Sequence, residues 1–108
     1  MISVAGFNTA IDRSFRLGAL QPGTVGRAEA EHAYPGGKGL HVAQAIAALG
    51  EPVQLVGLTD AAHRGWIEAR MRERGVSFRP VQIDSALRTC VALHEADGRT
   101  TEILGPGP

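Results

Sequence analysis

The sequence predicts an α/β fold, in which a parallel sheet with flanking helices is joined to a smaller β element. Residues 53–58 form a continuous apolar run with one interior glutamine, which is typical of a central parallel strand. The segments on both sides of this run carry apolar residues at helical spacing. Near the end of the chain, Asp97-Gly98 separates two short apolar runs, which predicts a β-hairpin.

The amino-terminal part of the chain predicts three strands. Residues 2–7 are a short apolar run, typical of a buried strand. Residues 11–17 alternate loosely and predict a strand exposed on one face. After a turn at Gln21-Pro22-Gly23, the polar residues 25–34 predict a second exposed strand.

The first helix is expected over residues 38–49. It should end at Gly50 in a left-handed conformation, and Pro52 follows just beyond. Its core-facing stripe is expected to consist of Val42, Ala43, Ile46, Ala47 and Leu49.

A second helix is expected over residues 61–74, capped by Thr59 or Asp60 and ending at Gly75. Its core stripe is expected to be Ala62, Trp66, Ile67 and Met71. Its outer face carries Arg64, Arg70, Arg72 and Arg74. These arginines could form a nucleic-acid patch, but we interpret them as a solvated helix face.

The last part of the chain predicts three more strands. Residues 76–83 form a strand in which Pro80 indicates a sheet edge or a bulge. Residues 87–94 and 100–104 form the two arms of the hairpin.

Composition limits the classes of function. The 108 residues are one small domain or part of a larger one, and 11 basic residues balance 11 acidic ones. We therefore expect neither nucleic acid nor a membrane as a partner. The single Cys90, the lack of a signal-peptide pattern and the lack of an apolar run of about 20 residues lead us to expect a soluble, cytoplasmic protein.

The segment Pro35-Gly36-Gly37-Lys38-Gly39 is the strongest functional signal. Glycine allows the backbone to approach a ligand closely, and the first N–H groups of a helix attract anions. Lys38 adds a full positive charge. The spacing is neither that of an ATP-binding P-loop nor that of a dinucleotide fingerprint. Taken alone, the segment fits an anion or polyol site and a tight turn with a solvated lysine equally well.

Metal binding is not expected. His32, His63 and His94 lack metal-ligand spacing, and we interpret them as surface or hydrogen-bonded residues.

Several motifs together resemble one family. They are Asn8-Thr9-Ala10-Ile11-Asp12-Arg13, the stretch from Pro35 to Ala43, Arg88-Thr89, Thr101-Glu102-Ile103 and Pro106-Gly107-Pro108. In order and spacing they resemble the amino-terminal third of the PfkB (ribokinase-like) carbohydrate kinases, over residues 1–108. The branch they resemble most is that of 1-phosphofructokinase and tagatose-6-phosphate kinase.

The resemblance implies a partial ribokinase-like fold, in which a β lid covers a sugar bound against the α/β part. It implies a substrate site made of Asp12, Gly36, Gly37, Lys38, Gly39, His41 and Arg88. Asp12 would accept hydrogen bonds from sugar hydroxyls, and Lys38 and Arg88 would neutralise a phosphate on the substrate. Without the family, Asp12 could be a turn residue and Arg88 a solvated strand residue.

The chain departs from the family pattern at four positions. The positions of His41, Cys90 and Leu104 are usually Asn in the family, and that of Thr9 is usually Pro. His41 can still form a hydrogen bond with a sugar, whereas Leu104 cannot. These changes leave the identity of the sugar open.

The family's catalytic segment is not in this sequence. The resemblance places the catalytic base and the ATP and magnesium contacts in a carboxyl-proximal Gly-Ala-Gly-Asp type segment, which the 108 residues lack. We therefore expect no catalytic residue and no bound cofactor in this chain, no kinase activity by it alone, and an unfinished, association-prone sheet edge. A homodimer through the β lid is also expected.

The function implied by the resemblance is ATP-dependent phosphorylation of a sugar phosphate. Fructose 1-phosphate is the expected substrate and fructose 1,6-bisphosphate the product. The alternatives are tagatose 6-phosphate, fructose 6-phosphate or another sugar. A non-catalytic truncated remnant or sugar-binding module stays open as well.

Overall fold

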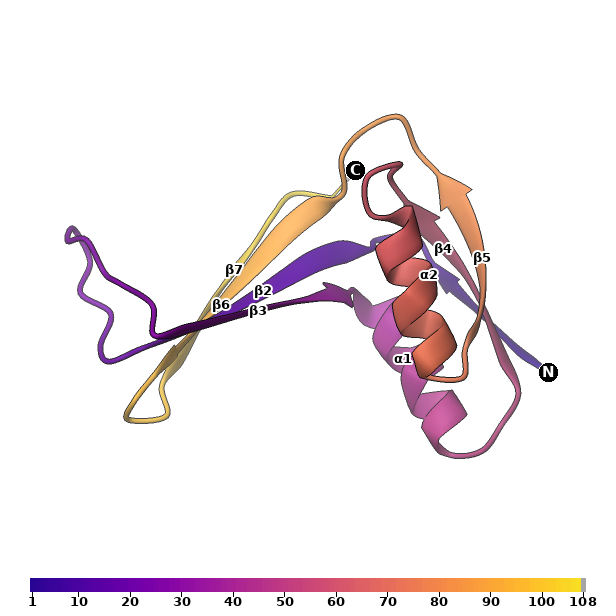
Figure 1. Ribbon diagram of the computed structural model, residues 1–108, viewed down its shortest axis with the longest axis horizontal. Coiled ribbons are helices and arrows are strands. Elements are labelled where there is room, and N and C mark those ends of the chain that lie inside the picture. Colours follow the sequence, from indigo (N-terminus) through magenta and orange to yellow (C-terminus); the bar gives the residue numbers. More distant parts are fainter. Residues whose placement is uncertain (108) are drawn as a thin grey trace.

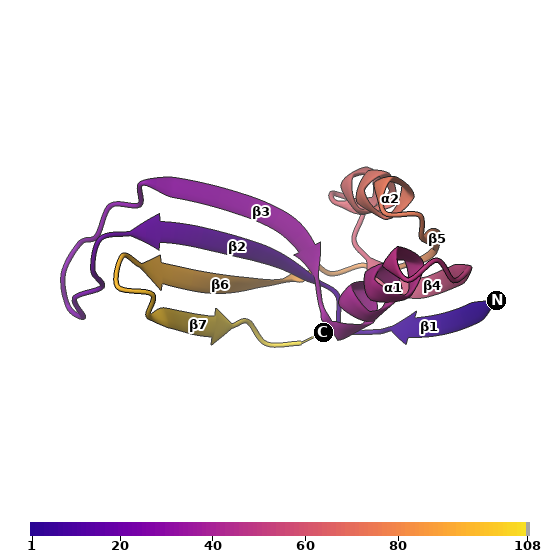
Figure 2. The ribbon, with the colours of Figure 1, turned by 90° about the horizontal axis from the view of Figure 1, so that it is seen from below.

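The computed structural model describes residues 1–107 as two β-sheets joined end to end. The molecule is elongated, with extents of 47 × 33 × 19 Å. A sheet with two helices lies at one end, and a long sheet without helices projects from it (Figures 1 and 2). Pro108 of the terminal motif lies outside the described residues.

The α/β part is a parallel sheet with helices on one face. Its strands are β1 (Ile2–Gly6), β4 (Val53–Thr59) and β5 (Ser77–Gln82), in the order β1-β4-β5. The helices α1 (Lys38–Ala48) and α2 (Arg64–Glu73) connect these strands. Because both crossovers run in the same direction and are right-handed by default, both helices cover the same face (Figure 2).

The core lies between this sheet and the two helices. Along β4, alternate residues from Val53 to Thr59 are buried, and the residues between them are half-buried. The largest completely buried side chains are Leu40, Leu55, Ile67 and Met71 together with Thr9 and Thr59. Thr9 shows that the core continues toward the start of the second sheet.

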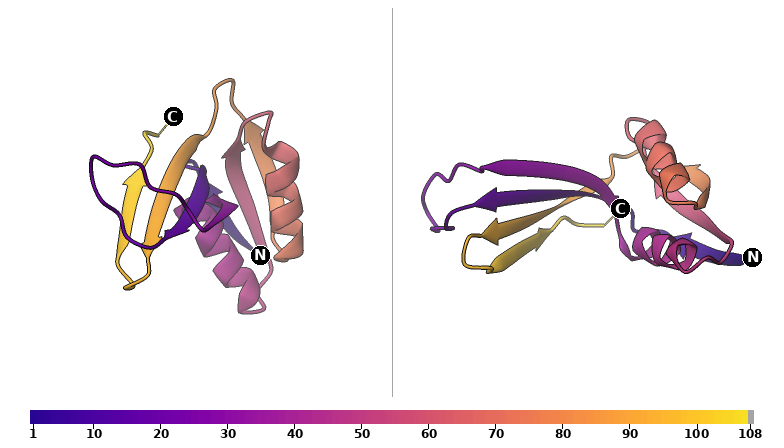
Figure 3. Two further views of the ribbon diagram at one scale, coloured as in Figure 1. Left: turned by 60° about the vertical axis from the view of Figure 1, so that its left-hand side comes forward. Right: turned by 60° about the horizontal axis from the view of Figure 1, so that its bottom comes forward.

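The projecting sheet is the β lid. It consists of β2 (Ala10–Leu17), β3 (Ala30–Gly36), β6 (Arg88–Glu95) and β7 (Thr100–Leu104), in the order β3-β2-β6-β7. The central pair, β2 and β6, is parallel, and the outer pairs are antiparallel. The α/β sheet with flanking helices and the separate β element confirm the predicted fold class (Figure 3).

Three turn glycines are confirmed by their backbone conformation. Gly50 and Gly75, which end the two helices, have φ of 87° and 75°. Gly98 in the hairpin between β6 and β7 has φ of 90°. Pro80 lies in β5, which is an edge strand, as expected for a residue without an N–H donor.

Two strand predictions are corrected. β1 is not a buried strand: it pairs only with β4 among the described residues, and Ile2 is 45% exposed. β3 begins at Ala30 and not at residue 25, because its antiparallel pairing with β2 runs from Ala30–Arg16 to Gly36–Ala10. The strand therefore ends inside the glycine segment and leads directly into α1.

The buried face of α1 is also corrected. Val42 and Leu49 were expected in the core, but they are 49% and 83% exposed, while Leu40 is 1% exposed. Leu40 and Ala43 are the buried residues, and Ile46 and Ala47 pack partly against the core. The helix carries apolar residues around much of its circumference, so spacing alone could not identify the inward face.

The second helix is shorter than expected. It begins at Arg64 because residues 61–63 form a turn, and it ends at Glu73. Ile67 and Met71 are buried as predicted, but Ala62 lies in the turn and is exposed, and Trp66 is exposed.

Neither α1 nor α2 has the length and hydropathy that a membrane-spanning helix needs, and the structure describes no other helix in residues 1–107.

Candidate functional site

Strand pairing brings the distant motifs of the sequence into one row across the lid. Ala10 of β2 pairs with Gly36 of β3 on one side and with Arg88 of β6 on the other. With strands 4.7–4.9 Å apart, the backbones of Gly36 and Arg88 lie about 10 Å from each other. The glycine segment and Arg88, which are 52 positions apart in sequence, thus flank the same strand.

Asp12 lies two residues after Ala10 on β2, and its carboxylate lies beside Gly36 of this row. It pairs with Tyr34 on one side and with Cys90 on the other, so all three are on the same face of the lid as Gly36. A Cβ atom built on Gly36 would overlap the Asp12 carboxylate. The glycine at position 36 therefore makes the space in which this carboxylate lies.

The other two glycines of the segment have different structural roles. Gly37 has φ of 104°, and a Cβ atom there would lie 2.7 Å from the carbonyl oxygen of Asn8. Gly39, in the first turn of α1, lies directly against Gly6 of β1, where a Cβ atom would meet the Gly6 backbone. Gly39 thus allows close packing of helix on strand, which sequence reasoning did not identify.

Both candidate phosphate-binding cations lack a carboxylate partner within residues 1–107. Lys38 is exposed at the first position of α1. Arg88 is half-buried; its Nη2 donates a 3.3 Å hydrogen bond to the carbonyl of Asn8, and its buried Nε has no partner among the described residues. The positive charges are therefore not neutralised by nearby acidic side chains of this part of the chain.

His41 lies one turn into α1 and faces the lid. Its Nε2 is 3.6 Å from Oδ2 of Asp12, which is close enough for an ion pair when the imidazole is protonated. Its ring also meets the ring of Tyr34 edge-on, with 6.5 Å between centroids. Tyr34 thus lies among the candidate site residues, and sequence analysis did not single it out although it directly precedes the Pro35-Gly36 motif.

A cavity of about 140 Å³ opens on the same face of the lid. It is lined by Asp12, Arg13, Tyr34, Cys90, Val91, Ala92, Glu102 and Leu104. Asp12 lines this cavity and its carboxylate lies beside Gly36, so it connects the cavity with the glycine segment. Cys90 and Leu104, which pair across β6 and β7, give the cavity an apolar wall.

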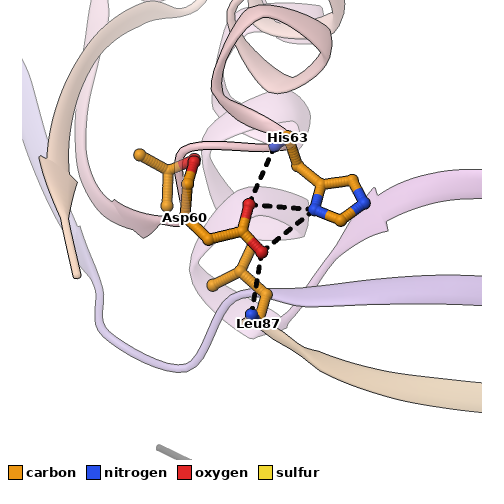
Figure 4. Close-up of polar contacts among 4 residues, drawn as sticks. Asp60, His63 and Leu87 are labelled. Carbon is orange, nitrogen blue, oxygen red and sulfur yellow. Dashed lines mark hydrogen bonds and ion pairs between the residues drawn. The ribbon is translucent and has the colours of Figure 1, made fainter. Parts of the chain in front are cut away.

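A second polar cluster joins the lid to the α/β part. The buried carboxylate of Asp60, which follows β4, accepts hydrogen bonds from the N–H of Leu87 (3.0 Å) and the N–H of His63 (2.8 Å) (Figure 4). Nδ1 of His63 lies 2.9 and 3.0 Å from its two oxygens. Asp60 thus holds the turn before α2 and the start of β6 at once. The predicted cap by Thr59 or Asp60 is wrong, because the N-cap residue of α2 is His63 and no side chain caps the helix.

The pKa of Asp60 reflects this environment. Burial raises the pKa of the Asp60 carboxyl, but the hydrogen bonds from Leu87 and His63 and the charge of His63 outweigh burial, so the pKa lies below its ordinary value of 3.8. Asp60 is therefore an ionised anchor and not a proton donor near neutral pH.

The histidines flagged in the sequence are dispersed. His63 contacts Asp60, His94 contacts Thr100 at 3.1 Å through Nδ1, and His32 is exposed on β3. Residues 1–107 contain no group of three or more His, Cys, Asp or Glu side chains suited to a metal ion.

Comparison with known proteins identifies a family that matches this chain. The model of the pfkB family carbohydrate kinases matches residues 3–107. A 1-phosphofructokinase from Xanthomonas campestris pv. campestris is 39% identical over 101 residues, which cover 93% of this chain and 32% of that protein. The chain therefore spans about a third of the length of this relative.

Solved structures agree in fold. A putative phosphofructokinase from Staphylococcus aureus matches with a TM-score of 0.84 and 26% identity, over 100% of this chain and 35% of that one. Phosphofructokinase-2 from Escherichia coli, in complex with fructose-6-phosphate, matches with a TM-score of 0.90 and 23% identity, over 98% of this chain and 35% of that one. A ribokinase from Cryptococcus neoformans var. grubii, in complex with ADP, matches with a TM-score of 0.77 and 27% identity, over 95% of this chain and 32% of that one.

These matches and the strand pairing that gathers the separated motifs around Asp12 have one explanation: the chain belongs to the pfkB family of carbohydrate kinases and corresponds to its amino-terminal part.

Proposed function

We propose that this chain is the sugar-binding and lid portion of an ATP-dependent kinase that converts fructose 1-phosphate to fructose 1,6-bisphosphate in the cytoplasm. The observation that carries the proposal is the position of the Asp12 carboxylate beside Gly36, in a site flanked by Arg88 and the start of α1. The name of the Xanthomonas relative, 1-phosphofructokinase, favours fructose 1-phosphate over other sugar phosphates.

The chemistry of the site fits a phosphorylated polyol. A carboxylate such as that of Asp12 accepts hydrogen bonds from two hydroxyl groups, and Tyr34 beside it offers a further hydroxyl. Lys38, Arg88 and the first N–H groups of α1 supply positive charge for a phosphate. Gly36 keeps a side chain out of the space in which the Asp12 carboxylate lies.

ATP and magnesium enter the proposal only for the complete enzyme. Residues 1–107 offer no cluster of carboxylates for a magnesium ion, so they do not fit that role. The Gly-Ala-Gly-Asp type segment, to which the family resemblance assigns the catalytic base, is not in the sequence. We therefore propose that the 108 residues bind sugar phosphate without transferring a phosphoryl group.

Two alternatives are tested by the same experiment. One is a non-catalytic remnant or sugar-binding module, which Leu104 and His41 at usual Asn positions favour. The other is a kinase for tagatose 6-phosphate, fructose 6-phosphate or another sugar.

The test has two parts. Calorimetric titration of the chain with fructose 1-phosphate, fructose 6-phosphate, tagatose 6-phosphate and fructose should give the highest affinity for fructose 1-phosphate and little binding of fructose. An assay of ATP-dependent phosphorylation should then be negative for the 108 residues and positive for a longer protein that contains the Gly-Ala-Gly-Asp segment. Phosphorylation by the 108 residues alone would refute the proposal that they bind sugar phosphate without transferring a phosphoryl group. Binding of fructose as tightly as fructose 1-phosphate would refute the phosphate site.

The lid also offers a surface for a homodimer, which we include in the proposal. One face of the lid exposes a cavity of about 310 Å³ lined by Phe15, Leu17, Leu20, Gly26, Ala28 and Leu93. Apolar residues on an uncovered sheet face favour burial against a second copy. Sedimentation equilibrium should show a dimer that Phe15→Asp converts to a monomer, whereas a monomeric parent would contradict this part.

A further inference from the structure

Residues 83–87 connect β5 to β6 and so join the α/β part to the lid (Figure 1). The middle of this connection, residues 84–86, is exposed. At its first residue, the N–H of Ile83 donates a 2.8 Å hydrogen bond to the carbonyl of Thr59. At its last residue, the N–H of Leu87 donates a 3.0 Å hydrogen bond to Oδ2 of Asp60 (Figure 4). Two consecutive residues at the carboxyl end of β4 therefore hold both ends of the connection.

The lid end of this connection leads directly into Arg88, the first residue of β6. Leu87, which precedes Arg88, is buried and is held by the carboxylate through its N–H. Thr89, which follows Arg88, accepts a 3.0 Å hydrogen bond from the N–H of Gly105 at its carbonyl. Arg88 itself pairs with Ala10 of β2. The backbone around Arg88 is thus held at three points, one of which is a carboxylate of the α/β part.

The guanidinium of Arg88 depends on this backbone support. Its Nη2 reaches the carbonyl of Asn8 at 3.3 Å, which is longer than the usual length of about 2.9–3.0 Å, and its buried Nε has no partner within residues 1–107. A guanidinium binds phosphate through a planar fork of N–H groups, so the contact is sensitive to where the fork lies. A displacement of the Arg88 backbone would therefore weaken a contact with phosphate.

We infer that Asp60 is a positioning residue for Arg88: through the N–H of Leu87, its buried carboxylate sets where the guanidinium meets the phosphate of a sugar phosphate. The carboxylate suits this role because a second N–H, that of His63, holds it at 2.8 Å. Supports of this kind fix the geometry of a binding group without contacting the ligand. The inference rests on the proposed function, because it concerns the phosphate contact of the same site.

A double-mutant cycle tests whether Asp60 acts through Arg88. Calorimetric titration with fructose 1-phosphate compares the parent chain with Asp60→Ala, Arg88→Ala and the double variant, each shown by circular dichroism to be folded. Asp60→Ala should weaken binding about three- to ten-fold in the parent, but less than about two-fold where Arg88 is already replaced by alanine. A loss of the same size in both backgrounds would overturn the inference, because Asp60 would then act independently of Arg88.

Asp60→Asn is measured in parallel, because it keeps the shape of the side chain if Asp60→Ala does not fold. Its single amide oxygen can accept from only one of the two N–H groups that the carboxylate holds. We expect a smaller loss of affinity for Asp60→Asn, which again disappears in the Arg88→Ala background. A loss that persists in that background would contradict the inference.

The matched control is His63→Ala. It removes the imidazole that contacts the Asp60 carboxylate at 2.9 and 3.0 Å but leaves the hydrogen bond from Leu87. Its affinity should stay within about two-fold of the parent, even where its stability falls. If His63→Ala weakened binding as much as Asp60→Ala, the loss would come from a loosened turn before α2, and the inference would be wrong.

The same titrations separate this inference from the proposed function. A parent that binds fructose 1-phosphate and an Arg88→Ala variant that binds it more weakly would support the proposed function, whatever the Asp60 variants do. Equal losses in both arms of the cycle would then overturn the positioning role alone. Failure of the parent to bind any sugar phosphate would overturn both.

Discussion

At Gly36 the backbone lies next to the Asp12 carboxylate, the proposed sugar-binding group. In Gly36→Ala, the added Cβ would overlap the Asp12 carboxylate, which would have to rotate away from its position. We expect the affinity for fructose 1-phosphate to fall about ten-fold or more, because a charged hydrogen bond to the sugar is lost. Isothermal titration calorimetry measures this change.

The matched control for this prediction is Gly18→Ala. A Cβ atom added to Gly18 would meet no neighbour within 4 Å, and this glycine does not require a positive φ. Its affinity should equal that of the parent. If Gly36→Ala bound as tightly as Gly18→Ala, the carboxylate would not be the sugar-binding group.

Leu104 provides a second test at the scale of one residue. It pairs with Cys90 at the apolar wall of the cavity that Asp12 also lines. Leu104→Asn introduces an amide that can bond to a sugar hydroxyl, so affinity should rise about two- to ten-fold. Ile103→Asn, on the opposite face of β7, is the control and should leave affinity unchanged. Equal affinities of the parent and Leu104→Asn would show that no sugar hydroxyl lies within reach of position 104.

At the scale of elements, α1 provides a test of the corrected helix face. Leu40→Ala removes a completely buried side chain and should lower the free energy of unfolding by about 2–5 kcal/mol. Val42→Ala, on the same helix but half-exposed, should change it by about 0.5 kcal/mol or less. Urea denaturation followed by circular dichroism measures both changes in the free energy of unfolding. A larger loss for Val42→Ala than for Leu40→Ala would show that Val42 faces the core.

Asp60 follows β4 and forms hydrogen bonds at the start of α2 and of β6. We therefore expect the stability of the fold to depend on the charge of Asp60, and so on pH. Folding lowers the pKa of Asp60, so its stabilising contribution is present well above the ordinary value of 3.8 and is lost as pH falls through the folded-state pKa. Asp60→Asn should therefore unfold more easily at pH 7, by about 2–4 kcal/mol, because a buried, hydrogen-bonded charge is lost.

The pH series decides whether this contribution is electrostatic. The difference in free energy of unfolding between the parent and Asp60→Asn should shrink as the pH falls below about 4. Asp84→Asn, at an exposed position between β5 and β6, should differ little from the parent throughout. A constant difference at all pH values would mean that the loss comes from packing and not from the carboxylate.

The sequence predicted which elements exist better than it predicted how they face the core. Gly50, Gly75 and Gly98 fixed the ends of helices and a hairpin, because few other residues adopt a positive φ. The face of α1 could not be predicted, since Val42 and Leu49 are as apolar as the residues that turn inward. Which face of a helix packs on the sheet depends on tertiary contacts, and the spacing of apolar residues does not specify these contacts.

For the whole molecule, the sequence suggested a set of candidate site residues but not their arrangement. The family resemblance implied that Asp12, the glycine segment and Arg88 belong to one site, and strand pairing brings Asp12, Gly36 and Arg88 onto three neighbouring strands. Tyr34 and the packing role of Gly39 depend on register and on the contact of α1 with β1, which no local pattern encodes. The role of Asp60 in joining the lid to the α/β part depends on Leu87, 27 positions away.

The central claim is that Lys38 and Arg88 bind the phosphate of a sugar phosphate held by Asp12. The most direct measurement is calorimetric titration of the parent, Lys38→Ala and Arg88→Ala with fructose 1-phosphate, with Arg79→Ala of β5 as an exposed control. The account predicts that Lys38→Ala and Arg88→Ala each weaken binding about ten-fold or more, while Arg79→Ala binds like the parent. Affinities for Lys38→Ala and Arg88→Ala equal to that of the parent would contradict it.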